Sequence, residues 1–278
     1  MARLAWDEMV DFAKVIRDDY KLFEGIELIP LETYDGMDTK PAWEFKVPMA
    51  SGFFKPYLIQ GSDKIEKITI GELHYMGRAK YCSLNMTASD DYDLPIFACE
   101  YDESAPRVGV TTDFMPTVDM AVHSDYLEKY YSRIASLWRQ YRTIPGFTKE
   151  GRCLLQRRYG PWPWARETLS PFSLDGRVEE KEDRKKVIES VVAYARVWLD
   201  LLKTAEPIKD PEYKQEMLRR KKTMQQYYRD KDPGGEVMKK IFGEDKHHLY
   251  VSLVFLKEDI DGRKHKMVTL PGNDEGAD

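Results

Sequence analysis

Apolar and polar residues alternate in short runs along the first part of the chain. Four such runs come before Lys80, and three more lie between Lys80 and Pro116, separated by turn-rich segments at 89–91 and 102–106. No full helical segment stands between consecutive runs, so the pattern predicts an antiparallel meander rather than a parallel βαβ sheet. The four early runs cover residues 26–30, 43–47, 53–60 and 65–75.

After Asp125 the apolar residues recur every third or fourth position, as on one face of a helix. The predicted helices cover residues 126–142, 184–204 and 212–229, with a fourth from Gly234 and a short one over residues 6–21. Residues 146–171 are irregular and rich in Pro, Trp and Arg, and a loop this long is uncommon without a function. Strands first and helices afterwards predict an α+β fold: a three-layer α/β/α sandwich with a central, mainly antiparallel sheet of about seven strands.

Length and composition fit a single globular domain. A chain of 278 residues can bury one large core, and it shows neither an internal repeat nor a linker. We expect the domain to cover residues 1–262, with a final apolar run at 249–255 and a polar, disordered tail at 263–278.

Composition also excludes several classes of protein. The net charge of −5 argues against a nucleic-acid partner, and no apolar run is long enough to span a membrane. The acidic, amphipathic start resembles neither a secretory signal nor a transit peptide, which predicts a cytoplasmic protein. Three Cys and five His lack metal-ligand spacing, and no glycine-rich phosphate loop occurs, so neither a metal nor a bound cofactor is expected.

The run that begins at Lys80 has two chemically different faces. Tyr81, Ser83, Asn85 and Thr87 alternate with apolar residues, so a strand places these polar groups on one side. The next run, 95–100, ends with Glu100 among apolar residues. A carboxylate there is costly unless it is paired or does chemistry; alternatively, Glu100 ends its strand in solvent.

The segment 92–100, followed by Thr112-Asp113-Phe114-Met115-Pro116, resembles the core of the ferredoxin-dependent bilin reductases. In that family an acidic residue, usually Asp, ends the same strand. Segments 83–87 and 125–131 are similar to the red chlorophyll catabolite reductases, which carry Glu at the strand end. The chain therefore combines features of two related families.

Two later segments extend this resemblance, which in total covers roughly residues 70–255. Segment 164–174, with Arg177 after it, is similar to a Trp, Phe-Ser-Pro, Leu-x-x-Arg segment of the bilin reductases. Segment 225–244 resembles a late segment in which an Asn-Asp-Lys turn starts a helix, and the Asp of that turn falls on Asp232. Lys231 and Pro233 stand where the family has Asn and Lys, which leaves the contacts beside Asp232 open.

The resemblance implies reduction of an open-chain tetrapyrrole, biliverdin above all, by single electrons from ferredoxin, without a metal or flavin of the protein's own. Glu100 and Asp232 would then be the proton donors, because burial raises the pKa of a carboxyl group. Asp232 before Pro-Gly-Gly could equally be a helix cap.

The resemblance also suggests five substrate-binding residues. Glu72 matches a Glu of the same strand, with an exposed edge charge as the alternative. Ser83 and Asn85 stand where many bilin reductases have His, and Asn can donate a hydrogen bond to a lactam carbonyl but is no proton source. Arg158 and Arg177 are candidates for binding propionates, with surface salt bridges as the alternative.

Two other functions and one interaction surface stay open. The protein could be a red chlorophyll catabolite reductase, or it could carry a tetrapyrrole without reducing it. The basic run 219–222 could steer an acidic ferredoxin, or it could be the solvated face of a helix.

Overall fold

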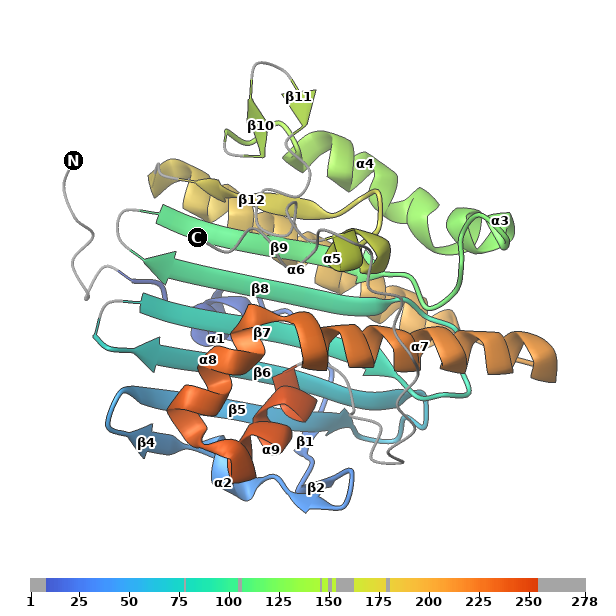
Figure 1. Ribbon diagram of the computed structural model, residues 1–278. Coiled ribbons are helices and arrows are strands. Elements are labelled where there is room, and N and C mark those ends of the chain that lie inside the picture. Colours follow the sequence, from blue (N-terminus) through green and yellow to red (C-terminus); the bar gives the residue numbers. More distant parts are fainter. Residues whose placement is uncertain are drawn as a thin grey trace.

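We describe a computed structural model of the chain for residues 9–77, 79–104, 107–145, 147–149, 152–153, 163–178 and 181–254. Helices and strands alternate irregularly along it, with most strands in the first half (Figure 1). The strands are β1 (Leu28–Pro30), β2 (Thr33–Tyr34), β3 (Met37–Asp38), β4 (Phe45–Val47), β5 (Ala50–Ile59), β6 (Ile65–Tyr75), β7 (Ala79–Ala88), β8 (Ile96–Ser104), β9 (Arg107–Met115), β10 (Thr148–Lys149), β11 (Arg152–Cys153) and β12 (Leu174–Val178). The helices are α1 (Phe12–Lys14), η2 (Val15–Asp19), α2 (Lys40–Trp43), α3 (Ser124–Tyr126), η3 (Leu127–Tyr131), α4 (Ser132–Tyr141), α5 (Pro163–Thr168), α6 (Lys181–Thr204), α7 (Pro211–Lys231), α8 (Pro233–Phe242) and α9 (Glu244–Val254), where η2 and η3 are π-helical turns.

One eight-stranded sheet forms the centre of the described molecule. Its strand order is β1-β5-β6-β7-β8-β9-β12, with β4 also paired to β5, and each of these pairs is antiparallel. Strands β5 to β9 follow one another in the chain and in space, because short turns connect antiparallel neighbours. This meander confirms the predicted sheet of about seven strands.

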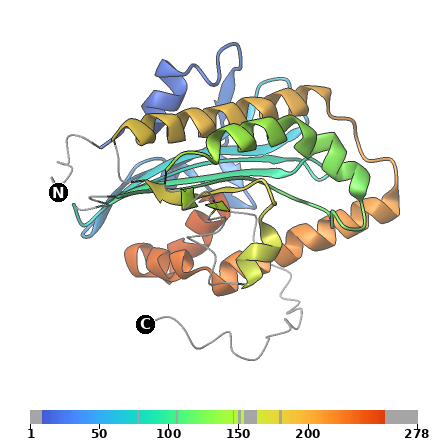
Figure 2. The same ribbon diagram turned by 90° about the horizontal axis from the view of Figure 1, so that it is seen from above.

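Helices cover both faces of the sheet, as Figure 2 shows. We call one side the α6 face; α1, η2, α4 and α6 lie on it, and Cys82, Leu84 and Met86 of β7 contribute to its large apolar core. We call the other side the α7 face; α5, α7, α8 and α9 lie there, and it carries the alternate residues Ser83 and Asn85 of β7. The predicted three-layer α/β/α arrangement is thus confirmed.

The two faces are packed differently. On the α6 face the apolar core is continuous, and Trp198 of α6 is fully buried and donates a hydrogen bond to the Pro95 carbonyl at 2.7 Å. On the α7 face the described residues form two separate apolar clusters. One joins α8 and α9 to β4–β6, and the other joins α5 and α7 to Ile96 and Met115. Polar residues of β6 to β9 lie between these clusters.

Several expected element boundaries differ from the structure. Strand β8 continues to Ser104, into the turn expected at 102–106, because Glu103 is buried and paired with Arg184 at 3.1 Å. The predicted irregular loop contains α5, which begins at Pro163, and the antiparallel pair β10 and β11. The strand β12 was not predicted. The expected tail at 263–278 lies outside the described residues, and within them no helix is long and apolar enough to cross a bilayer.

Candidate functional site

A row of small and acidic residues crosses the α7 face at right angles to the strands. Successive cross-strand partners in this row are Gly71, Ser83, Glu100, Thr111 and Asp175, one from each of β6, β7, β8, β9 and β12. Directly opposed residues in an antiparallel sheet point to the same side, with Cβ atoms about 5 Å apart. The period-two alternation of each strand therefore brings these five residues into one line.

Glu100 stands in the middle of this row and is only 7% exposed. It lies within β8, four residues before the strand's end at Ser104, so the alternative of a solvated strand end is wrong. Its neighbour Thr111 donates a hydrogen bond from Oγ1 to Oδ1 of Asp175 at 2.8 Å. Two buried carboxyl groups therefore flank one hydroxyl.

Asp232 approaches the same face from the helical layer. It ends α7 and begins α8, where its Oδ1 accepts a hydrogen bond from the Gly234 N–H at 2.8 Å. It is nonetheless 7% exposed, which is low for a helix-capping side chain. The helix cap accounts for an Asp at this point of the chain, but it does not account for the burial of the side chain. Asp232 therefore stays a predicted proton donor.

Tyr228 lies one turn before Asp232, and its phenol is close enough to both candidate proton donors to be affected by their charges. Burial raises the pKa of Tyr228 far above its ordinary value, and the nearby charges of Glu100, Asp232 and Asp113 raise it further. The phenol oxygen is 3.4 Å from Thr168 Oγ1. Since one phenol is affected by all three carboxylates, these groups share a common, poorly solvated region.

Asp113 is a fully buried member of this group that sequence reasoning did not assign a role. Its two carboxylate oxygens accept hydrogen bonds from the Ser170 N–H at 2.7 Å and the Ser170 hydroxyl at 2.5 Å. Burial, with a smaller contribution from Asp175, raises the pKa of Asp113 to about 7. The two hydrogen bonds between Asp113 and Ser170 join two of the segments that carry the family resemblance, 112–116 and 164–174.

Four hydroxyl groups around the row have no hydrogen-bond partner among the described residues: those of Thr69, Ser83, Thr87 and Ser252. Each of these residues is buried. A buried hydroxyl without a partner costs about 1–3 kcal/mol, and native proteins rarely gather several in one place. The α7 face between the two apolar clusters therefore has the chemistry of a site built for a polar ligand.

Asn85 and Lys67 use their side chains to hold α9 against this region. The Asn85 amide donates to the carbonyl of Val254, and the Lys67 ammonium donates to the carbonyls of Ser252 and Leu253. Burial lowers the pKa of Lys67 to about 7. Lys67 was not identified from the sequence, where it stands among alternating residues like any solvent-facing lysine.

Glu72 lies on the opposite side of the sheet from Ser83 and Glu100. It pairs with Lys80 at 2.9 Å and accepts a hydrogen bond from the Ala13 N–H at 2.9 Å, which fixes the start of α1. At 4% exposure it is not the exposed edge charge of the alternative interpretation. The structure also does not bring it together with the other expected substrate-binding residues, because residues 71 and 72 of one strand point to opposite faces.

The two predicted arginines have different outcomes. Arg177 is exposed on β12, on the α7 face, two residues from Asp175. Gly109 of β9 is the cross-strand partner of Arg177. It leaves room for the Asp102 carboxylate, because a Cβ at position 109 would lie 2.7 Å from Oδ1 of Asp102. Arg158 lies outside the described residues, so its role stays a prediction.

The basic run 219–222 is only partly free at the surface. Arg220 donates to the carbonyls of Pro116 and Glu167 at 3.0 and 2.9 Å, and Lys221 is buried and paired with Asp90 at 2.5 Å. Two of the four cations therefore hold α7 against the sheet, and only the other two are exposed.

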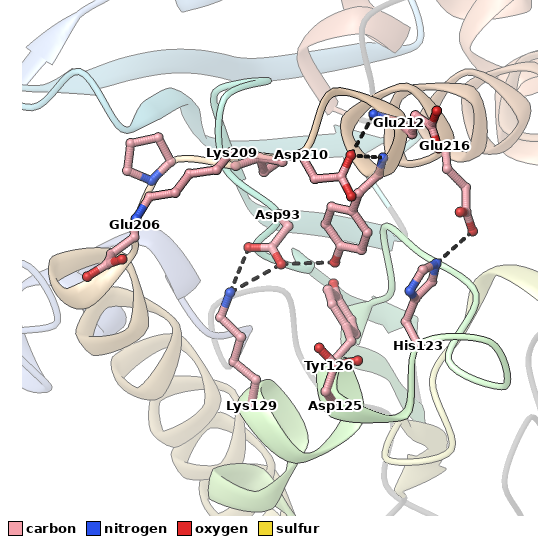
Figure 3. Close-up of a pocket in the computed structure, with 13 residues that line it drawn as sticks. Asp93, His123, Asp125, Tyr126, Lys129, Glu206, Lys209, Asp210, Glu212 and Glu216 are labelled. Carbon is pink, nitrogen blue, oxygen red and sulfur yellow. Dashed lines mark hydrogen bonds and ion pairs between the residues drawn. The ribbon is translucent and has the colours of Figure 1, made fainter.

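Asp93, from the first segment with a family resemblance, has a structural role. Its carboxylate accepts hydrogen bonds from Lys129 at 3.0 Å, Tyr130 at 2.5 Å and Tyr213 at 3.0 Å, which joins η3 to α7. Figure 3 shows Asp93 at the wall of a pocket of about 640 Å³ that lies outside the polar row. Acidic residues outnumber lysines in its lining, which makes it unfavourable for an acidic partner.

The comparisons with known proteins agree on one family. Residues 62–256 match the sequence model described as ferredoxin-dependent bilin reductase. A phytochromobilin:ferredoxin oxidoreductase of Arabidopsis thaliana, described as chloroplastic, is 25% identical over 159 residues; these cover 56% of this chain and 45% of that protein. A 15,16-dihydrobiliverdin:ferredoxin oxidoreductase of Nostoc punctiforme is 22% identical over 236 residues, which cover 81% of this chain and 90% of that protein.

A solved structure has the same fold. The crystal structure of phytochromobilin synthase from tomato in complex with biliverdin superposes with a TM-score of 0.70 at 17% sequence identity, covering 88% of this chain and 85% of that one. No group of three or more His, Cys, Asp or Glu side chains in the described part of the chain is arranged to hold a metal ion. With a family model that matches well over half of its length, the chain belongs to the ferredoxin-dependent bilin reductase family.

Proposed function

We propose that this protein reduces an open-chain tetrapyrrole, biliverdin IXα in the first place, with electrons supplied one at a time by ferredoxin. The observation that carries the proposal is the position of Glu100 and Asp232, which are distant in sequence but both buried on the α7 face around the phenol of Tyr228. Membership of the bilin reductase family supplies the chemistry that two such carboxyl groups would serve.

The protein's own part in the reaction would be to bind, shield and protonate the pigment. Reduction of one carbon–carbon double bond consumes two electrons from two ferredoxins and two protons from the protein. Glu100 is the first donor, because it stands in the polar row at the centre of the sheet face. Asp232 is the second, and the Thr111–Asp175 hydrogen bond gives Glu100 a neighbouring route for reprotonation.

Asp113 can support this proton transfer near neutral pH. With a pKa of about 7 and two hydrogen bonds from Ser170, it exchanges between its neutral and charged forms in the pH range in which ferredoxin systems are assayed. Ferredoxin itself would act as an external donor, since the proposal needs no electron-carrying group held by this chain. Its docking surface would need exposed cations, of which Arg219 is one on α7.

The test is an absorbance series under low oxygen. Purified protein is mixed with biliverdin, and ferredoxin, its reductase and NADPH are then added. We expect a new visible band on mixing and a blue shift on reduction, as conjugation shortens. Glu100→Gln and Asp232→Asn should bind the pigment but turn over about 10²–10⁴ times more slowly.

A matched control comes from the other face of the sheet. Glu72→Gln changes a carboxyl group that is as deeply buried as Glu100 but points toward α1, so turnover per folded molecule should stay at the wild-type level. Wild-type rates in both the Glu100 and the Asp232 variants would show that the proton donors are wrongly assigned.

The alternatives give different outcomes in the same series. A tetrapyrrole carrier would form the first band without any shift, and a red chlorophyll catabolite reductase would reduce that catabolite in preference to biliverdin. The relatives named above act on bilins by their names, which favours biliverdin. The cytoplasmic location stays a prediction, since the Arabidopsis relative is described as chloroplastic.

A further inference from the structure

An open groove of about 580 Å³ runs between η2 and the early turns of α6, both of which lie on the α6 face (Figure 2). Its apolar side chains continue the core of that face, since Ile188 belongs to the core and the others pack against it. The residues that line the groove are Val10, Val15, Asp19, Tyr20, Arg184, Lys185, Ile188 and Glu189. A segment with apolar side chains would remove this surface from water on binding.

The two ends of the groove differ in charge. At one end the exposed Lys185 follows Arg184 in the early part of α6. At the other end, burial raises the pKa of the Tyr20 phenol, and the nearby charges of Glu189 and Asp19 raise it further, so these three side chains lie close together. Along the axis of α6, Arg184 and Glu189 are about 8 Å apart. The groove therefore has a cationic end and an anionic end, one to two helical turns from each other.

Val10 fixes the end at which the preceding part of the chain enters the groove. Its N–H donates a hydrogen bond to Glu103 at 3.0 Å, and its carbonyl accepts one from the Lys80 ammonium at 2.7 Å. Glu103 also pairs with Arg184 at 3.1 Å, so Val10 lies at the cationic end. The helix α1 begins only after Val10, which is therefore held by two strands of the sheet rather than by a helix.

Residues 1–8 lie outside the described residues, but the order of their side chains matches the groove. Read back from Val10, the sequence offers two acids, then apolar residues and then a cation: Glu8, Asp7, Trp6, Ala5, Leu4 and Arg3. The five steps from Glu8 to Arg3 can span up to about 17 Å when extended, more than the about 8 Å between the two ends. Acids would thus meet the cationic end, and Arg3 can reach the anionic end.

We propose that residues 3–8 of this chain bind in the groove, where Leu4 and Trp6 cover Val15 and Ile188. The acids then lie beside Lys185, and Arg3 lies beside Glu189. Because the segment is joined to the groove through Val10, it binds at a high effective concentration, which a second copy of the chain or a free ligand does not have. The groove and Glu100 lie on opposite faces of the sheet, so this inference is independent of the proposed function.

The first experiment isolates the fluorescence of Trp6 as the difference between the wild type and Trp6→Phe. An indole in the groove is shielded from water, so the difference spectrum should be blue-shifted relative to that of the urea-unfolded proteins, and acrylamide should quench it poorly. Trp6→Ala should lower the Tm by about 2–4 °C. It should also increase binding of the apolar dye ANS, because the groove loses its cover.

Charge reversal tests the position of the segment. Lys185→Glu and Glu8→Lys should each shift the Trp6 emission to the red and make it easier to quench. The two changes together should restore most of the wild-type emission, because the pair of opposite charges is restored with its partners exchanged. A purely structural effect of Lys185→Glu on α6 would not be rescued by Glu8→Lys. Lys46→Glu, at an exposed lysine on β4, is the matched control and should leave the Trp6 emission unchanged.

Four outcomes would overturn the inference. Trp6 emission in the wild type that matches a water-exposed indole would show that the segment is not bound. Blue emission that Lys185→Glu leaves unchanged would place Trp6 at another site. Blue emission confined to dimers in sedimentation experiments would assign the groove to a second copy of the chain. Equal ANS binding by the wild type and Trp6→Ala would show that the groove is open to a small apolar ligand.

Discussion

The buried carboxyl group of Asp113 makes folding stability depend on pH in a way that one substitution can remove. Asp113 has no exposed surface, and its partners are the N–H and the hydroxyl of Ser170. In the neutral acid, one oxygen accepts from the N–H and the other donates to the hydroxyl oxygen. Asparagine offers the same acceptor and donor at every pH. Asp113→Asn should therefore mimic the protonated form.

The sign of the effect follows from the pKa. Burial raises the pKa of Asp113 from an ordinary value of about 3.9 in the unfolded chain to about 7 in the folded protein. Below pH 4 both states are protonated, so Asp113 has no effect on stability. Between pH 4 and pH 7 the unfolded state ionises first, and stability falls as the pH rises. Above pH 7 the cost is constant at about 4 kcal/mol.

The assay is urea denaturation followed by tryptophan fluorescence at pH 5 and pH 8. Integration over this interval gives a change of about 2.5–3 kcal/mol, so Asp113→Asn should gain that much stability relative to the wild type on going from pH 5 to pH 8. Asp63→Asn, at an exposed aspartate, should show no such change. A stability difference that is the same at both pH values would refute the reasoning, and a difference that falls with pH would reverse the assigned direction.

Three further predictions concern the framework around the site. Glu72→Ala leaves Lys80 buried without its partner and should lower the free energy of unfolding by about 3–5 kcal/mol, with unchanged biliverdin turnover per folded molecule. Gly52→Ala would place a Cβ 1.9 Å from the Glu72 carbonyl oxygen, so thermal denaturation should show a loss above about 3 kcal/mol or no soluble protein. Asp93→Asn weakens the charged acceptor that joins η3 to α7 and should cost about 1.5–3 kcal/mol in urea denaturation, whereas Tyr213→Phe should cost about 1 kcal/mol.

The sequence predicted the elements whose pattern is local. The alternation in β5 to β9 reflects one apolar face toward α6, and short turns leave little choice of topology. Strand β12 was missed because its sequence, Leu-Asp-Gly-Arg-Val, has two charged residues in five. The strand tolerates both charges, because Asp175 accepts a hydrogen bond from Thr111 of the neighbouring strand and Arg177 is exposed. A contact between segments so distant in the chain leaves no local signal in the sequence.

The same distinction applies to the candidate site. Ser83 and Asn85 could be assigned to one face, because the period of a strand fixes the side of each residue. Glu100 lies on the next strand, so its place beside Ser83 depends on the register between β7 and β8. The face of Glu72 could not be assigned relative to them, since that depends on the register between β6 and β7. The position of Asp232 depends on how α7 crosses the sheet. It could be predicted only through the family resemblance.

The difference between the two sheet faces explains why the polar row can be a site at all. On the α6 face one continuous apolar core buries the sheet, and even its charged groups are paired, as Glu103 is with Arg184. On the α7 face the helices pack through two separate clusters, and the strip between them retains buried hydroxyls without partners. Most of the buried apolar residues in the described part of the chain therefore lie on the side away from the polar row. This division frees the other side to keep unsatisfied polar groups, at a cost in free energy that the apolar core of the first side can offset.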